Sequence, residues 1–148
     1  MSASIAIRRL FLEPKPLYSI AEAAALLGID VAGLRGWIDA GEIECDDGLR
    51  VSWAELISFG LDFWSQQVVE DALGPDLTDA MPELLRLTDL EVRIPRLQVI
   101  TLERIAARDD ATVSAVLARE LRDLVSANSE HLSAEVPGFA EALYWPHP

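Results

Sequence analysis

The sequence predicts a mainly α-helical protein of two small modules, and three observations lead to this prediction. Residues that favour helix capping precede apolar runs of helical period. A Gly-Pro pair at residues 74–75 breaks the helical pattern in the middle of the chain. Beyond it, an alternating segment is followed by two more helical segments. We therefore expect a first module over residues 1–73, a linker over 74–89 with one short helix near residues 82–87, a second module over 90–126 and a tail over 127–148.

Three helices are predicted in the first module from their caps. Ser19 and Glu22 have the spacing of a capping box, and Gly28 ends the helix that begins there. Asp30 is the expected N-cap of a second helix, over residues 31–40. Ser52 is the expected N-cap of a third helix, which we extend to about residue 73.

Two segments of the first module are predicted to be extended. Residues 5–12 alternate poorly and are expected to form a short strand or an ordered arm. Residues 43–51 contain an Asp-Asp-Gly turn between two short runs, which predicts a small hairpin. Five large aromatic residues of the module are expected to pack in the core: Trp37, Trp53, Phe59, Phe63 and Trp64. For Phe59, Phe63 and Trp64 the alternative is a subunit interface.

The second module has the order strand, helix, helix. Leu90, Val92 and Ile94 alternate with charged residues, which predicts a strand over residues 90–94. A helix is expected from Pro95 to about residue 108, and a second from a Thr112 cap to about residue 126. Asp110 lies in the turn between them, where Asp tolerates a left-handed backbone better than most residues.

Composition limits the classes of function. The formal net charge is −13, and neither half of the chain is basic: residues 1–66 hold five basic and ten acidic groups. No apolar stretch reaches membrane-spanning length, no leader is evident, and the single Cys45 excludes an internal disulfide, so we expect a cytoplasmic location. No phosphate-binding glycine loop, metal-ligand spacing or catalytic set of residues is present. We therefore predict that the chain is not an enzyme and that it binds no cofactor or metal.

Residues 17–57 carry a motif that spans the first two predicted helices, the predicted hairpin and the start of the third helix. It begins with Leu17-Tyr18-Ser19-Ile20-Ala21-Glu22-Ala23-Ala24-Ala25-Leu26-Leu27-Gly28-Ile29 and continues, in order, through Leu34, Trp37, Ile38, Gly41, Ile43, Gly48 and Val51-Ser52-Trp53-Ala54-Glu55-Leu56. This motif resembles the winged helix-turn-helix of the MerR/excisionase family. The resemblance implies a recognition helix over Val31–Ala40 and a wing over Glu44–Val51. The DNA-contacting residues it implies are Val31, Gly33, Arg35, Gly36 and Arg50.

The pattern of residues 90–125 is similar to the ribbon-helix-helix (Arc/MetJ-type) module. The resemblance implies that two chains pair their strands into a ribbon and interlock their helices, which makes the protein a homodimer. It also places Arg93 among the outward strand residues that contact DNA in such modules. The alternative is a plain helical hairpin packed on the third helix. The expected dimerisation residues are Leu90, Val92, Ile94, Leu102, Leu117 and Leu121.

The tail is a candidate partner-binding segment, because its large apolar residues lie close to one helical face. Its expected contact residues are Phe139, Leu143, Tyr144 and Trp145. In antitoxins of this architecture such a segment binds the toxin protein; the alternative is a tail folded back on its own domain.

These resemblances imply a transcriptional regulator that binds double-stranded DNA as a homodimer, as the antitoxin and autorepressor of a toxin–antitoxin pair. Acidic residues argue for a first alternative: Asp46 and Asp47 in the wing repel phosphate, so the fold would serve as a protein-binding adaptor without DNA binding. A second alternative is an excisionase-like factor that bends DNA.

Overall fold

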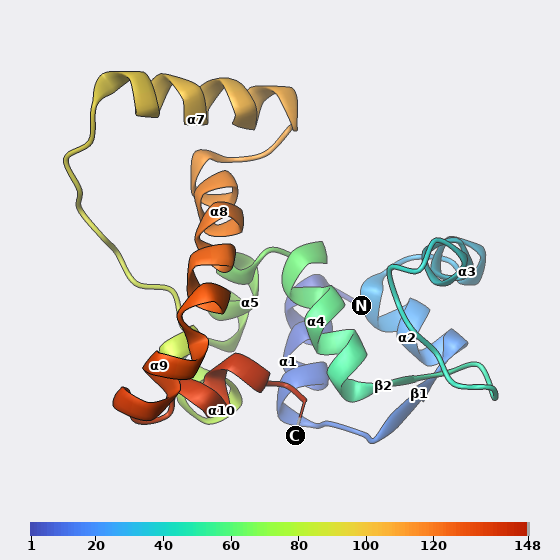
Figure 1. Cartoon of the computed structure of the whole chain (residues 1–148). Helices are drawn as coiled ribbons and strands as arrows, with labels where there is room; N and C mark the ends of the chain where they lie inside the picture. The colour runs from blue at the N-terminus through green and yellow to red at the C-terminus, as the bar shows by residue number, and fades with distance from the viewer. Residues whose placement is uncertain (148) are drawn as a thin grey trace. The chain divides into compact units, whose positions relative to one another are not determined.

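The computed structural model describes residues 1–147 and is mainly helical, as the sequence predicts (Figure 1). It divides into two compact units. Unit 1 comprises residues 1–87 together with 144–147, and unit 2 comprises Thr88–Leu143. No helix of the described chain is both long and apolar enough to cross a bilayer.

Unit 1 consists of packed helices and one two-stranded sheet. Its elements are α1 (Ala3–Leu12), β1 (Leu17–Ser19), α2 (Ile20–Leu27), α3 (Val31–Asp39), β2 (Arg50–Ser52), α4 (Trp53–Phe63), α5 (Gln66–Leu73) and α6 (Leu77–Ala80). Strands β1 and β2 pair antiparallel, with Tyr18 opposite Val51. Helix α1 lies beside both α4 and α5, and α2 packs on α3.

The caps predicted from the sequence are confirmed. Ser19 and Glu22 form both hydrogen bonds of a capping box, and Gly28 ends α2 in the left-handed conformation with a φ of 71°. The Asp30 side chain accepts a hydrogen bond from the Gly33 backbone N–H, and the Ser52 side chain accepts one from that of Glu55. Each cap satisfies a helix-end donor that would otherwise lack a partner.

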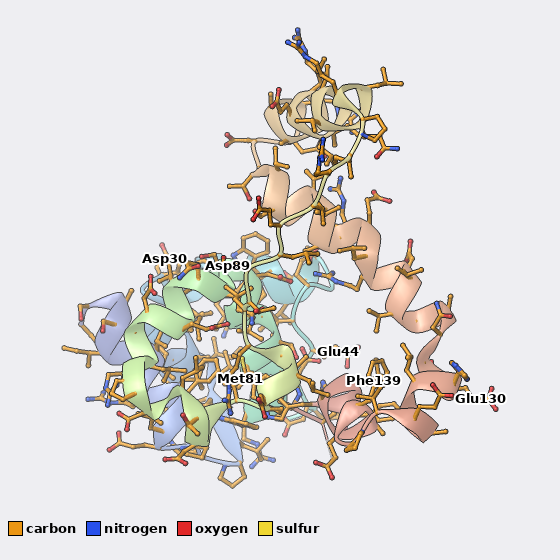
Figure 2. All side chains as sticks on the ribbon, turned by 90° about the vertical axis from the view of Figure 1, so that its left-hand side faces the viewer. Asp30, Glu44, Met81, Asp89, Glu130 and Phe139 are labelled. Carbon is orange, nitrogen blue, oxygen red and sulfur yellow. The ribbon has the colours of Figure 1, made fainter. Side chains whose placement is uncertain are left out.

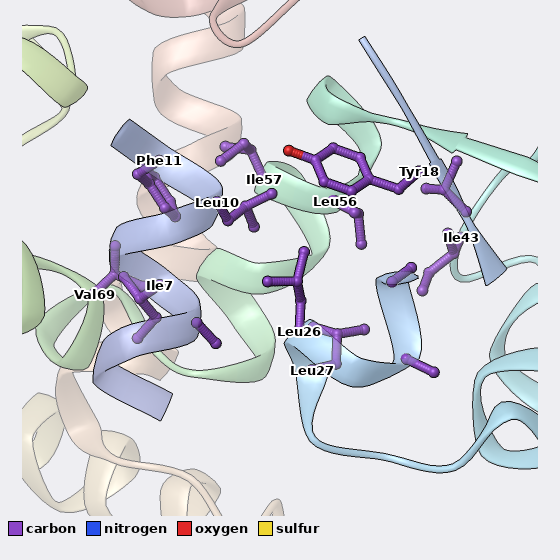
Figure 3. Close-up of a cluster of buried hydrophobic side chains, with 14 of the residues drawn as sticks. Ile7, Leu10, Phe11, Tyr18, Leu26, Leu27, Ile43, Leu56, Ile57 and Val69 are labelled. Carbon is purple, nitrogen blue, oxygen red and sulfur yellow. The ribbon is translucent and has the colours of Figure 1, made fainter. Parts of the chain in front are cut away.

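One continuous core fills unit 1 (Figure 3). Ile7 and Leu10 of α1 are fully buried with Leu56 of α4 and Val69 of α5. Leu34 of α3 belongs to the same core. Polar contacts fix the same helices: Arg8 donates to the carbonyls of Ala72 and Leu73 at 3.2 and 3.1 Å, and the Trp53 indole N–H donates to the Leu10 carbonyl at 2.9 Å. Residues distant in sequence thus hold the unit together.

Three predictions about the secondary structure of unit 1 are wrong. Residues 5–12 belong to helix α1, because Ile7, Leu10 and Phe11 form an apolar face at helical spacing. The helix expected over residues 53–73 is broken at Ser65, which has a φ of 69°. The hairpin expected over residues 43–51 is also absent. The residues expected to end its second strand belong to β2, which pairs with β1 instead. Residues 46–49 form a tight turn.

The segment predicted as a linker, residues 74–89, carries short helical turns at Gly74–Asp76, Leu77–Ala80 and Glu83–Leu85. Leu73 and Met81 are buried in the core of unit 1, and Arg86 donates to the carbonyls of Thr78 and Met81. The division between the units therefore falls after Leu87.

Unit 2 contains α7 (Arg96–Arg108), α8 (Val113–Ala127), α9 (Ser129–Glu135) and most of α10 (Phe139–Tyr144). The predicted Thr112 cap of α8 and the left-handed Asp110 are confirmed. The strand predicted over residues 90–94 is absent, since those residues carry no regular structure and pair with no other segment of the described chain. A strand needs a partner for its backbone hydrogen bonds.

Candidate functional site

The candidate recognition helix is α3, and its start is set by a glycine turn and an aspartate cap. Gly28 directs the chain from α2 into α3, and Asp30 accepts a 2.6 Å hydrogen bond from the Gly33 backbone N–H. A Cβ atom at Gly33 would lie 2.9 Å from Asp30 Oδ1, so the cap explains this glycine. Leu34 is fully buried and fixes the helix on the core.

Most of α3 is exposed. All its residues except Leu34 and Ile38 lie at the surface, including the four residues predicted for DNA contact: Val31, Gly33, Arg35 and Gly36. Arg35 forms no ion pair within residues 1–147. A Cβ atom at Gly36 would have nothing within 4 Å. The helix therefore presents one free guanidinium group on a narrow surface that a neighbouring molecule can approach closely.

The candidate wing is arranged differently. Asp46 Oδ1 accepts a hydrogen bond from the Arg50 backbone N–H at 2.8 Å, and Asp46 Oδ2 accepts one from Arg50 Nε at 3.1 Å. These bonds, the backbone one foremost, lower the pKa of Asp46 below its usual value. Arg50, the wing's cation, is thus paired within its own turn, whereas Arg35 is not.

Two further features of this region were not predicted. Asp39 comes four residues after Arg35, so both side chains share one face of α3. Trp37, expected in the core, is 41% exposed, and its ring meets the edge of Phe59 at 5.5 Å between centroids. The expectation of a buried Trp37 is therefore wrong, because one side of the indole packs on Phe59 and the rest faces solvent.

The predicted dimerisation residues lie in unit 2, and most are exposed. Leu90 is 78% exposed, and Val92, Ile94, Leu117 and Leu121 also count among the exposed apolar residues. Leu102 is half-buried. Arg93, predicted to contact DNA, is exposed on the segment before α7. Figure 2 shows this segment beyond Asp89 and the side chains that project from α7 and α8.

The predicted partner-binding residues divide between the two units. Phe139 and Leu143 are half-buried in unit 2. Trp145 belongs to unit 1, where its ring meets that of Trp53 edge-on at 6.2 Å between centroids. Tyr144 is 65% exposed. Of the four, Tyr144 alone is largely free to contact a partner, and Trp145 instead packs on its own chain.

The described residues contain no group of three or more His, Cys, Asp or Glu side chains that would hold a metal ion. No protein-family model, curated protein or solved structure matches this chain.

Proposed function

We propose that the chain is a transcriptional regulator that binds double-stranded DNA through α3. The observation that carries this proposal is the exposure of α3 around Arg35, whose guanidinium group has no ion-pair partner among the described residues. An α-helix fits the major groove, and Arg is the side chain that most often reads guanine there through two hydrogen bonds.

The glycines beside Arg35 support the same proposal. Gly33 and Gly36 keep the surface of α3 low, so the helix backbone can approach a base edge or a phosphate closely. Because glycines occupy these two positions, Arg35 is the one cation of α3, and few contacts to phosphate are available. We expect weak binding by a single copy and strong dependence on salt concentration.

Because one α3 helix would bind DNA weakly, a dimer would be needed to supply a second recognition helix. We propose that two chains associate through unit 2 and place two α3 helices on successive half-sites, roughly 34 Å apart along the duplex. The exposed apolar residues of unit 2 support this, because single soluble chains seldom expose so many leucines, valines and isoleucines on one short segment.

The test measures binding by fluorescence anisotropy to the DNA upstream of the chain's own gene, at low salt. Arg35→Ala should weaken binding by about tenfold or more, since a good bidentate base contact is worth roughly 1–3 kcal/mol. The matched control is Arg122→Ala, which removes an exposed cation from α8. Equal binding by wild type and Arg35→Ala would overturn α3 as the reading element.

A second candidate function is a protein-binding adaptor that does not bind DNA. The observation that favours it is the Asp46–Arg50 pair, which neutralises the wing cation that DNA would otherwise attract. An antitoxin role adds a toxin-binding segment, for which the exposed Tyr144 is the remaining candidate. Absence of any DNA binding by the wild-type chain, together with a stable complex with a partner protein, would favour the adaptor.

A further inference from the structure

An open pocket lies between α3 and α4, on unit 1. It has a volume of about 370 Å³ and is lined by three aromatic rings and three carboxylates: Trp37, Phe59, Phe63, Glu42, Glu55 and Asp62. No lysine or arginine lines it. An aromatic wall with an acidic rim is unusual for a surface whose only task is to face water.

The aromatic wall is built from both helices. Trp37 of α3 meets Phe59 edge-on, and Phe59 stacks on Phe63 of the same helix at 5.6 Å between centroids with an interplanar angle of 21°. Trp37 and Phe63 remain 41% and 39% exposed. Exposed aromatic rings of this kind are the usual anchors of protein interfaces.

The acidic rim results from helix periodicity. Glu55, Phe59 and Asp62 are spaced by four and three residues, so α4 presents them on one face. Glu42 is held at the other side by the bond from its backbone N–H to the Trp37 carbonyl, 3.0 Å long. Within residues 1–147 none of these three carboxylates forms an ion pair, whereas Glu22, Asp46, Asp76 and Asp109 do.

We propose that this pocket binds an arginine side chain from a basic segment of a partner protein. The planar guanidinium group stacks on aromatic rings and donates in a fork that matches carboxylate oxygens. The ammonium group of lysine is more strongly hydrated and lacks the flat surface, so it fits this chemistry less well. The unpaired negative charge of the rim supplies the complementarity.

This site does not depend on the proposed DNA function. Arg35 and Trp37 are two residues apart on α3, and residues at that spacing do not face each other on a helix. The partner's arginine would therefore approach a different side of α3 from the one proposed to face DNA, and either function could fail without the other.

The test titrates the ¹⁵N-labelled full chain with N-acetyl-argininamide and monitors the tryptophan indole N–H resonances by NMR. The Trp37 resonance, assigned with Trp37→Phe, should shift saturably. The Trp53 indole, which donates to the Leu10 carbonyl, should not shift. The neutral isostere N-acetyl-citrullinamide should bind about tenfold more weakly, because it lacks the charge that strengthens both kinds of contact.

Variants separate the pocket from the general negative field of the chain. Glu55→Gln with Asp62→Asn should weaken binding of the argininamide by about tenfold. The matched control, Glu120→Gln with Asp123→Asn, removes the same charge from α8 and should leave binding unchanged. Equal weakening by the two double variants, or equal binding of the citrulline isostere, would overturn the proposal. Much tighter binding of benzyltrimethylammonium than of argininamide would also overturn it, because the site would then serve a free organic cation.

Discussion

Units 1 and 2 differ in how they bury apolar side chains. Unit 1 has a core to which helices α1 to α5 all contribute, with Ile7, Leu34 and Leu56 fully buried. In unit 2 the buried apolar residues are Ala106, Val116 and Ala142. Along α8, Val113, Leu117 and Leu121 form a stripe at four-residue spacing, and all three are exposed.

This difference is the basis for our proposal that unit 2 associates with a second copy, whereas unit 1 buries its core within one chain. A short helical segment gains little free energy from burying two alanines and a valine, since the hydrophobic contribution scales with the area removed from water. Its polar contacts at the turn, from Arg108 and Arg119 to Asp109, lower the pKa of Asp109 but lie at the surface. Surface ion pairs add little stability.

The largest expected effect is loss of core packing in unit 1. Leu56→Ala should lower the free energy of unfolding by about 2–5 kcal/mol, because Leu56 is fully buried and truncation leaves a cavity. Urea unfolding monitored by tryptophan fluorescence measures this, since all four tryptophans lie in unit 1. Leu124→Ala, at a residue 59% exposed in unit 2, should leave that transition unchanged. An equal loss of unfolding free energy in the two variants would contradict the difference in core packing between the units.

The next effect concerns association. Leu121→Glu should weaken the dimer by roughly 100-fold, because a buried, unpaired carboxylate at an interface costs several kcal/mol. Within one chain Leu121 is 43% exposed, so the charge itself is tolerated. Sedimentation equilibrium should give twice the 16.3 kDa chain mass for the wild type and for Arg122→Ala, and the chain mass for Leu121→Glu. If Leu121→Glu sediments as the wild type does, α8 is not the interface.

Removal of a helix cap should have a smaller effect on stability, and a different kind of effect in each unit. Ser19→Ala should cost about 1 kcal/mol in unit 1, since it removes the side-chain oxygen that accepts a hydrogen bond from the Glu22 backbone N–H. Thr112→Ala removes the cap of α8, where Thr112 Oγ1 accepts from the Ala115 N–H at 3.0 Å, and should lower the melting temperature in a concentration-dependent manner. A concentration-independent change for Thr112→Ala would show that unit 2 folds alone.

The smallest effect is on acid stability. Hydrogen bonds from Lys15, and then from Ser19, lower the pKa of Glu22 from 4.5 to about 2. A carboxylate with a lowered pKa contributes its full stabilisation above the unfolded value, and loses it as the pH falls from 4.5 towards 2. NMR titration of the Glu22 carboxyl should show the low pKa in the wild type and a higher one in Lys15→Ala. An unchanged pKa in Lys15→Ala would contradict the assigned cause.

Local chemistry made the helix ends predictable. The caps at Ser19, Asp30, Ser52 and Thr112 depend on residues three positions apart, so the sequence alone identifies them. The same holds for the left-handed Asp110. Helix α1 was predictable in principle from its apolar spacing, but two arginines within that run obscured the pattern.

Features that depend on distant residues were not predictable. The pairing of β2 with β1 joins segments far apart in the chain, and the break at Ser65 involves neither Gly nor Pro. For the candidate site, the exposure of Val31, Arg35 and Gly36 was predicted. The Arg50–Asp46 pair was not, because it depends on the tight turn at residues 46–49, which forms where β2 pairs with β1 in place of the expected hairpin. The pocket joins aromatic residues of two helices and has no sequence motif.

Amide hydrogen exchange of residues 90–94 in the full-length protein decides whether two copies of unit 2 associate through paired strands. These residues carry no regular structure in one chain, and we predict that they form a strand paired with a second copy in the dimer. Slow exchange that is lost on dilution or in Leu121→Glu is the predicted result. Fast exchange of every one of these amides at concentrations where the protein is dimeric would contradict the claim, because the two copies would then associate without pairing this segment.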